Sequence, residues 1–130
     1  MSFILDTDHC IAILRGRLDV NTHTSATTRL FITAITVSEL TYGAHKSDRR
    51  TDHLAQVNLL IDAATVLPFD EAAARRCGEL KDALRRVGTP LSEPDLQIAS
   101  IALHHALPFA THNQRHFVRV PGLSLVDWMP

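Results

Sequence analysis

The sequence has few aromatic residues, few cysteines and no long apolar run, and each shortage excludes a class of protein. Aromatic residues make up 5% of the chain, which is too few for nucleic-acid binding that relies mainly on base stacking. Cys10 and Cys77 form no C-x-x-C pair, which indicates reduced, buried thiols rather than disulfides or a zinc site. No apolar run approaches the length of a membrane span, and the start MSFILDTD is acidic rather than basic. We therefore expect a cytoplasmic protein.

The net charge of the chain is also close to zero. The formal net charge is -1, which argues against a protein that coats nucleic acid by bulk electrostatics but permits a local basic surface. With 130 residues, 45% of them hydrophobic, the chain is long enough for one compact domain with its own core. We expect a single domain over residues 1–130.

Short apolar runs alternate with longer segments of helical periodicity along the chain. The predicted strands are Phe3 to Asp6, Leu30 to Ile35, Thr65 to Leu67, Pro108 to Thr111 and Leu123 to Val126. The predicted helices are His9 to Arg15, Val37 to Lys46, Asp48 to Ala64, Asp70 to Val87 and Glu93 to Ala106, with a loop or poorly formed helix at Val20 to Arg29. Strands separated by helices require crossover connections, so the fold class is α/β with a parallel sheet covered on both faces.

Two aspartates, Asp6 and Asp8, follow the first predicted strand in FILDTDHCIAIL. Side chains alternate along a strand, so both carboxylates would start on the same side. Two carboxylates about 5 Å apart repel by roughly 3 kcal/mol at an effective dielectric constant of about 20. The pair therefore needs a cation, a proton or separate hydrogen-bond partners. We expect Asp6 to bind a cation and Asp8 to cap the helix that begins at His9.

Further polar residues stand at the ends of other predicted strands or at the starts of helices. Glu39 follows the strand run FITAI, Asp95 begins the helix after TPLSEP, and Asn113 follows PFAT. In a parallel sheet, such positions converge on one crevice at the carboxyl ends of the strands. Each acid also has a purely structural explanation, because Thr36 to Glu39 and Ser92 to Asp95 both match a helix capping box.

The chemistry of the possible cluster is that of a hard cation site. Carboxylates of Asp6, Glu39 and Asp95, with the amide oxygen of Asn113, suit Mg²⁺ or Mn²⁺ better than zinc. Such a cation, when bound, activates water and neutralises charge on a phosphodiester, which is metal-assisted hydrolysis.

The chain resembles the PIN-domain ribonucleases, and among them the VapC toxins of bacterial toxin–antitoxin pairs. The matching segments are LDTDHCIAILRG, ITVSELTYGAHKS, LPFDEAAA, GTPLSEPDLQIASIAL and FATHNQRHFVRVPGLSLVDW, in the family's order over nearly the whole chain. The resemblance implies a PIN-like three-layer α/β/α fold with a central parallel sheet of four to five strands. It also implies Mg²⁺- or Mn²⁺-dependent endoribonuclease activity, with RNA as substrate.

The same resemblance implies roles for individual residues and partners. Asp6, Glu39 and Asp95 match the family's metal ligands, the fourth acidic position falls on Asn113, and Thr111 matches a hydroxyl that orients water or ligands. A cognate VapB-type antitoxin would bind a groove formed by helices within Val37 to Ala64, and the chain would form a homodimer. Alternatively, the apolar residues of that segment fill the domain's own core; they are Leu40, Leu54, Val57 and Ile61.

Three other interpretations fit parts of the sequence. FILDTDHC is similar to the nucleophile motif of haloacid-dehalogenase-like phosphatases, in which Asp6 would form an aspartyl phosphate and Asp8 would act as acid and base. That mechanism needs a lysine, and the only lysines are Lys46 and Lys81, in charged helical segments. A catalytically silent PIN-like module is the second alternative, although none of the three acids is lost. Zinc binding by the eight histidines lacks a completing ligand set, so solvated or hydrogen-bonded histidine is favoured.

Overall fold

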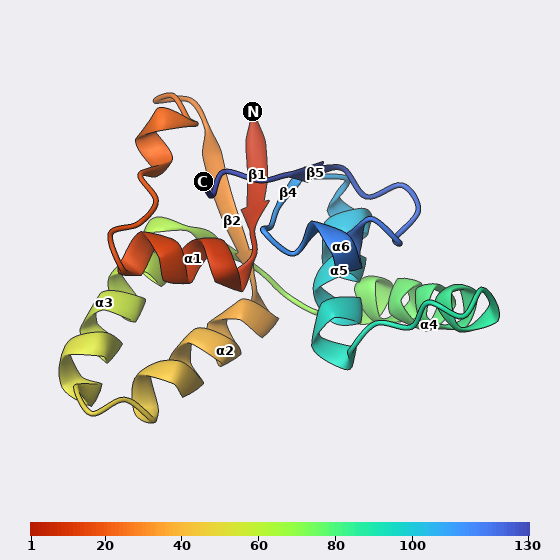
Figure 1. Ribbon diagram of the computed structural model, residues 1–130, viewed down its shortest axis with the longest axis horizontal. Helices are drawn as coiled ribbons and strands as arrows, with labels where there is room; N and C mark the ends of the chain where they lie inside the picture. The colour runs from red at the N-terminus through yellow and green to blue at the C-terminus, as the bar shows by residue number, and fades with distance from the viewer.

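The computed structural model describes residues 1–130 as strands separated by one or two α-helices, with one short 3-10 helix (Figure 1). The strands are β1 (Ser2–Leu5), β2 (Arg29–Thr33), β3 (Thr65–Leu67), β4 (Phe109–Ala110) and β5 (Leu125–Val126). The helices are α1 (Thr7–Leu14), η1 (Val20–Thr22), α2 (Ala34–His45), α3 (Arg50–Ala63), α4 (Glu71–Arg86), α5 (Glu93–His105) and α6 (Gln114–Phe117). None of the helices is both long and apolar enough to cross a membrane.

The strands form one five-stranded parallel sheet in the order β3-β2-β1-β4-β5. The first strand therefore lies in the centre, where Ile4 pairs with Phe31 of β2 on one side and with Phe109 of β4 on the other. The chain builds outward through β2 and β3 and later continues on the opposite side of β1. Such a reversal leaves a crevice at the carboxyl ends of the two strands where it occurs, here β1 and β4.

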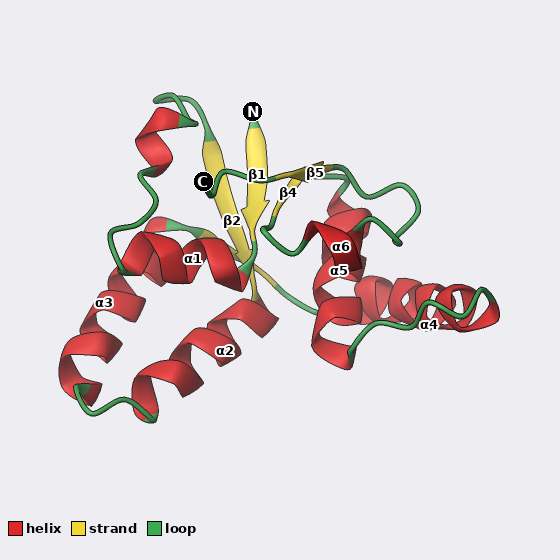
Figure 2. Ribbon diagram, viewed as in Figure 1, coloured by secondary structure: helices red, strands yellow, loops and turns green.

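Consecutive strand residues face opposite sides of the sheet, and this alternation creates two hydrophobic cores. Ile4 and Phe109 belong to a core that includes buried residues of α4 and α5. Leu5 and Ala110 belong to the other core, with buried residues of α1, α2 and α3. Figure 2 shows these two groups of helices on either side of the yellow strands. The predicted α/β/α arrangement with a parallel sheet is confirmed.

The largest boundary error in the prediction lies at the end of β2. The prediction extended this strand to Ile35 and began the helix at Val37, whereas the strand ends at Thr33 and α2 begins at Ala34. The Thr33 hydroxyl accepts a hydrogen bond from the Thr36 N–H at 3.2 Å and caps the helix. An apolar run such as FITAI does not by itself distinguish a buried strand from the first turn of a buried helix.

The start of α1 also corrects the prediction. The helix begins at Thr7 rather than at His9, and its cap is Asp6, whose carboxylate accepts a hydrogen bond from the Thr7 N–H. The expected capping role of Asp8 is therefore wrong, because Asp8 lies within the first turn of α1. One helix, α6, was not predicted at all, since a four-residue segment is too short to show periodicity. Both cysteines are free and buried, as expected.

Candidate active site

The carboxyl ends of the two central strands are joined by a buried hydrogen bond. Asp6 directly follows β1, and Thr111 directly follows β4. The Thr111 hydroxyl donates to Oδ2 of Asp6 at 2.7 Å, and both residues are buried. The crevice that the strand order creates therefore contains two of the predicted site residues in direct contact.

Glu39 reaches this crevice from α2 through Thr7. The Thr7 N–H donates to Oδ1 of Asp6 at 2.8 Å, while its hydroxyl donates to Oε1 of Glu39 at 2.7 Å. The capping-box explanation of Glu39 is wrong, because the cap of α2 is Thr33 and Glu39 lies in the second turn. Glu39 is exposed, so an exposed carboxylate is directed to the mouth of the crevice without a helix-capping purpose.

Asp95 and Asn113 meet on the other side of the crevice through His116. The Asn113 amide nitrogen lies 2.9 Å from Nδ1 of His116, and the Asp95 carboxylate lies 3.9 Å from the same ring nitrogen. Asn113 is tied to the strand end as well, since its N–H donates to the Thr111 hydroxyl at 3.0 Å. The Ser92 hydroxyl caps α5 by accepting from the Asp95 N–H, so Ser92 alone performs the capping that the sequence assigned to the pair.

The four polar residues predicted at the strand ends are thus linked by one series of contacts around the crevice, open between Glu39 and Asp95, which we call the acidic ring. In order around the crevice its members are Glu39, Thr7, Asp6, Thr111, Asn113, His116 and Asp95. The structure therefore brings Asp6, Glu39, Asp95, Asn113 and Thr111 together. Sequence reasoning missed Thr7 and His116 as the connecting residues. Thr7 could have been found from its position between two aspartates, whereas the position of His116 depends on the unpredicted α6.

The electrostatics of the ring centre on Asp6. Burial, together with repulsion by the carboxylates of Asp8 and Asp95, raises the pKa of Asp6 from 3.8 to about 7, although the hydrogen bonds from Thr111 and Thr7 lower it. No lysine or arginine forms an ion pair with Asp6 or Asp95. A buried carboxylate without a cationic partner is destabilised in its charged form, and a bound cation would relieve that destabilisation.

The side chains do not by themselves form a closed metal cage. No group of three or more histidine, cysteine, aspartate or glutamate side chains is arranged so that it could hold a metal ion. The reason is that Glu39 bonds to Thr7 and Asp95 lies toward His116. The donor set nevertheless fits a hard cation, because its free atoms are carboxylate and amide oxygens and its central carboxylate lacks a counter-charge.

Known protein families and individual proteins match this chain over nearly its whole length. The model of the PIN domain matches residues 3–123. The tRNA(fMet)-specific endonuclease VapC of Salmonella typhimurium is 37% identical over 135 aligned residues, which cover 98% of both chains.

The chain belongs to the PIN-domain family, in its VapC group.

Solved structures of the VapC group superpose closely on this PIN domain. VapBC2 from Rickettsia felis, bound to a fragment of its promoter DNA, gives a TM-score of 0.90 at 25% identity, covering 98% of this chain and 99% of that one. DNA-bound VapBC from Salmonella typhimurium gives 0.89 at 37% identity, covering 98% of each chain. The resemblance inferred from the sequence motifs is confirmed.

The phosphatase alternative is not supported in this PIN domain. Its general acid and base, Asp8, is held by other groups: Oδ1 lies 2.8 Å from Nδ1 of His9, and Oδ2 accepts from the His112 N–H at 2.9 Å. Burial alone would raise the pKa of Asp8, but these hydrogen bonds outweigh it and hold that pKa below its ordinary value. Both candidate lysines are engaged elsewhere, since Lys81 pairs with Glu93 and Lys46 lies over the ring of Tyr42.

A groove of ≈ 520 Å³ lies between α1, α2 and α3 of the PIN domain and adjoins the acidic ring at Thr7 and Glu39. Leu40 and Val57 line it, and both are buried in the domain's own core. Leu54 and Ile61 pack against the same core. The core role of this segment is therefore confirmed, and Leu40 and Val57 line a groove as well; binding of an antitoxin in that groove stays a prediction.

Proposed function

We propose that this chain is a divalent-metal-dependent endoribonuclease of a toxin–antitoxin pair, with Asp6, Glu39 and Asp95 as metal ligands. The observation that carries the proposal is the acidic ring, in which Asp6 after β1, Glu39 of α2 and Asp95 of α5 stand around the crevice between β1 and β4, and none of them pairs with a lysine or arginine. Membership in the VapC group and the names of its relatives, ribonuclease and endonuclease, support RNA hydrolysis as the reaction.

The residues of the ring suit Mg²⁺ or Mn²⁺. Both ions prefer oxygen ligands and retain several waters, so a few carboxylates suffice. When bound, such an ion activates water for attack and neutralises charge on the phosphodiester. Asp6 supplies the central carboxylate and is held in orientation by the Thr7 N–H and the Thr111 hydroxyl.

The remaining residues orient groups around that carboxylate. Thr7 holds Glu39 near Asp6, because its hydroxyl donates to Glu39 while its backbone N–H donates to Asp6. Asn113 offers an amide oxygen in place of a fourth carboxylate, while its own N–H is fixed by the Thr111 hydroxyl. The ring thus carries one negative charge fewer than a four-acid site, which favours one firmly held ion over two.

The substrate that the relatives' names suggest is tRNA(fMet), and we propose it for this chain. A test incubates the purified protein with tRNA(fMet) in MgCl₂ or MnCl₂, with elongator tRNA(Met) as the matched RNA. Cleavage should require the metal, stop in EDTA and fall by at least about 100-fold in Asp95→Asn. Cleavage of both tRNAs would remove the substrate proposal, and cleavage that persists in EDTA and in Asp95→Asn would overturn the mechanism.

Glu39→Gln separates catalysis from folding. Glu39 is exposed and does not cap α2, so the substitution should change the free energy of unfolding by no more than about 0.5 kcal/mol. Metal-dependent cleavage should nevertheless be lost. Asp62→Asn, at an exposed position of α3, is the control for the change in charge. If Asp95→Asn is folded but inactive while Glu39→Gln is fully active, Glu39 is not a metal ligand. If the wild-type protein binds RNA without cutting it, the alternative of a catalytically silent PIN-like module is favoured.

An antitoxin segment is the occupant that we propose for the groove between α1, α2 and α3. The neighbouring structures of the VapC group are VapBC complexes, and the groove adjoins Glu39, so a segment bound there would obstruct the site. Gly43 lines the groove, and a Cβ added there meets no atom within 4 Å outside its own helix backbone and chain neighbours. Gly43→Arg should therefore fold and cleave RNA but resist inhibition when the cognate antitoxin is co-expressed; full inhibition of this variant would place the antitoxin elsewhere.

Homodimer formation stays a prediction, which light scattering of the purified protein tests.

A further inference from the structure

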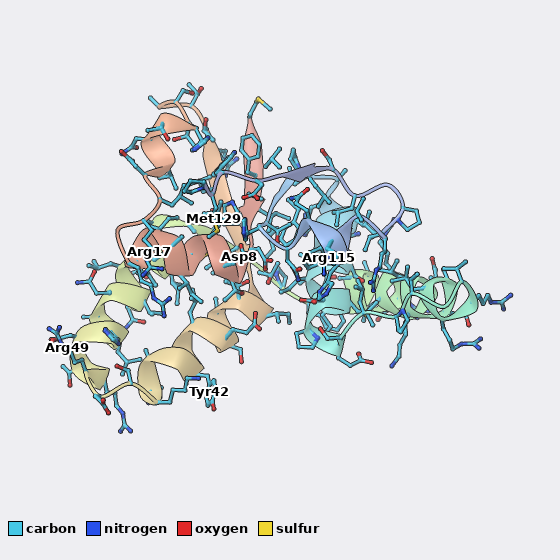
Figure 3. The ribbon with its side chains drawn as sticks, viewed as in Figure 1. Asp8, Arg17, Tyr42, Arg49, Arg115 and Met129 are labelled. Carbon is cyan, nitrogen blue, oxygen red and sulfur yellow. The ribbon has the colours of Figure 1, made fainter.

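Asp8 connects the first turn of α1 to the loop that follows β4. One of its carboxylate oxygens, Oδ2, accepts from the His112 N–H at 2.9 Å and lies 3.3 Å from the Thr111 hydroxyl. The other, Oδ1, lies 2.8 Å from Nδ1 of His9. Figure 3 shows Asp8 at the end of α1 that adjoins β1. Asp8 therefore contacts the strand end that carries Thr111, although it belongs to neither the metal-ligand set nor a helix cap.

His9 is fully buried, and its surroundings define which ring nitrogen carries the proton. Nε2 lies 3.0 Å from the backbone nitrogen of Trp128, which has a hydrogen to donate. Because that N–H can only donate, Nε2 must accept, and the ring proton resides on Nδ1. Nδ1–H then donates to Asp8. The backbone of the C-terminal tail thus sets the orientation of the imidazole, and the imidazole sets the orientation of the carboxylate.

The tail is itself fastened at several points. The Trp128 ring packs edge-on against Phe3 of β1, with centroids 4.9 Å apart, and stacks on His23 at 5.3 Å. Beside it, the Asp127 carboxylate lies 2.9 Å from Nδ1 of His112. The tail therefore contacts the loop after β4 directly, through Asp127 and His112, and indirectly, because Trp128 bonds to His9 and His9 bonds to Asp8.

We propose that Asp8 and His9 are positioning residues of the nuclease, which hold Thr111 against Asp6 through the backbone of His112. This inference rests on the proposed function. Thr111 has a single hydroxyl proton, and that proton goes to Asp6 at 2.7 Å while the same oxygen accepts from Asn113. The position of the loop after β4 therefore sets how Thr111 and Asn113 are oriented toward Asp6. Two side chains outside the ring hold this loop at a backbone atom, Asp8 at the His112 N–H and Gln114 at the Thr111 carbonyl. Asp8 is the one that comes from a distant part of the chain.

Matched substitutions of His9 separate positioning from simple packing. Asparagine places its amide near the position of Nδ1, and glutamine places its amide near the position of Nε2, so His9→Asn keeps the bond to Asp8 whereas His9→Gln keeps the bond to Trp128. If His9 serves to orient Asp8, His9→Asn should retain more activity than His9→Gln. If His9 only anchors the tail, the order of the two variants should be reversed.

Substitution of Asp8 gives the complementary test. The His112 N–H and the His9 Nδ1–H approach different oxygens of the Asp8 carboxylate, and an amide has only one oxygen to accept with. Asp8→Asn should therefore lower kcat for tRNA(fMet) cleavage by about 10- to 100-fold, the usual effect of losing a supporting hydrogen bond. KM should stay within about two-fold, because Asp8 makes no proposed contact with RNA. Asp62→Asn at an exposed position of α3 and His105→Asn at the exposed end of α5 are the controls.

A second readout does not depend on cleavage. Amide exchange followed by NMR should show a faster-exchanging His112 N–H in Asp8→Ala and in His9→Gln, and an unchanged one in His9→Asn. An exchange rate equal to that of the wild type in Asp8→Ala, which has no side-chain acceptor, would overturn the proposal even if no RNA substrate is found. An active wild type whose kcat is unaffected by Asp8→Asn would overturn it as well, while leaving the nuclease function intact.

Discussion

Removing the charge of Asp6 should stabilise the metal-free protein at alkaline pH while abolishing its activity. The folded state raises the pKa of Asp6 from 3.8 to about 7 through burial and through repulsion by Asp8 and Asp95. Between these two pH values the folded state binds a proton that the unfolded state releases. Folding stability therefore falls as the pH rises through this window, and the full penalty applies above pH 7.

The magnitude follows from the shift. Each pKa unit corresponds to about 1.4 kcal/mol. The raised pKa of Asp6 therefore lowers the free energy of unfolding by about 4 kcal/mol at pH 8, where the carboxyl is ionised in both states. At pH 5 the carboxyl is mostly protonated in the folded state and mostly ionised in the unfolded state, and the reduction is about 2 kcal/mol. In Asp6→Asn the amide oxygen can still accept from the Thr7 N–H, and the Thr111 hydroxyl can turn toward Asp8, 3.3 Å away. We therefore subtract only about 1 kcal/mol for weakened hydrogen bonding. The variant should exceed the wild type by about 3 kcal/mol at pH 8 and by about 1 kcal/mol at pH 5.

Urea unfolding in EDTA at pH 5 and pH 8 measures both values. Asp62→Asn on the exposed face of α3 controls for the loss of one negative charge. Stability differences between Asp6→Asn and the wild type that are equal at the two pH values would refute the argument, because a group that does not titrate differently on folding cannot produce pH-dependent stability.

Three further predictions concern the cation and two helix ends. In thermal scans at pH 8, MgCl₂ or MnCl₂ should raise the Tm of the wild type but not that of Asp6→Asn, with about 2.7 kcal/mol of stabilisation at 100 times the Kd; equal shifts in both proteins would place cation binding elsewhere. Thr33→Ala should lower the free energy of unfolding in urea by about 1 to 2 kcal/mol, because its hydroxyl caps α2; a smaller effect than that of Glu39→Gln would contradict the assignment of this cap. Ala106→Gly should raise Tm by about 4 °C, since Ala106 ends α5 at a φ of 53°, where glycine avoids a cost of about 1 kcal/mol; an unchanged or lower Tm would show that the left-handed turn costs nothing.

Some features followed from local sequence alone. The limits of β3 agree with the prediction because Thr65–Leu67 is bounded by clear breaks in periodicity. The α4 helix was predicted to within one residue at each end, since Asp70 caps it and its apolar residues recur at helical spacing. The limits of β2 and α1 were less accurate, because Thr33 and Asp6 are capping residues that stand inside or beside apolar runs. The pattern of apolar and polar residues does not show which of several neighbouring polar side chains caps the first turn of the helix.

The α/β class, the acids at the strand ends and the family of the chain could all be recognised before folding, because hydrophobic periodicity and ordered motifs are properties of the linear chain. The roles of Asp6 and Asp8 could be assigned only from the folded arrangement. Asp6 both caps α1 and lies at the centre of the acidic ring, whereas Asp8 bonds to His9 and to His112, over 100 residues away along the chain. Contacts between residues so far apart depend on β1 and β4 being neighbours in the sheet, and that pairing is set by packing of the whole chain rather than by any local pattern.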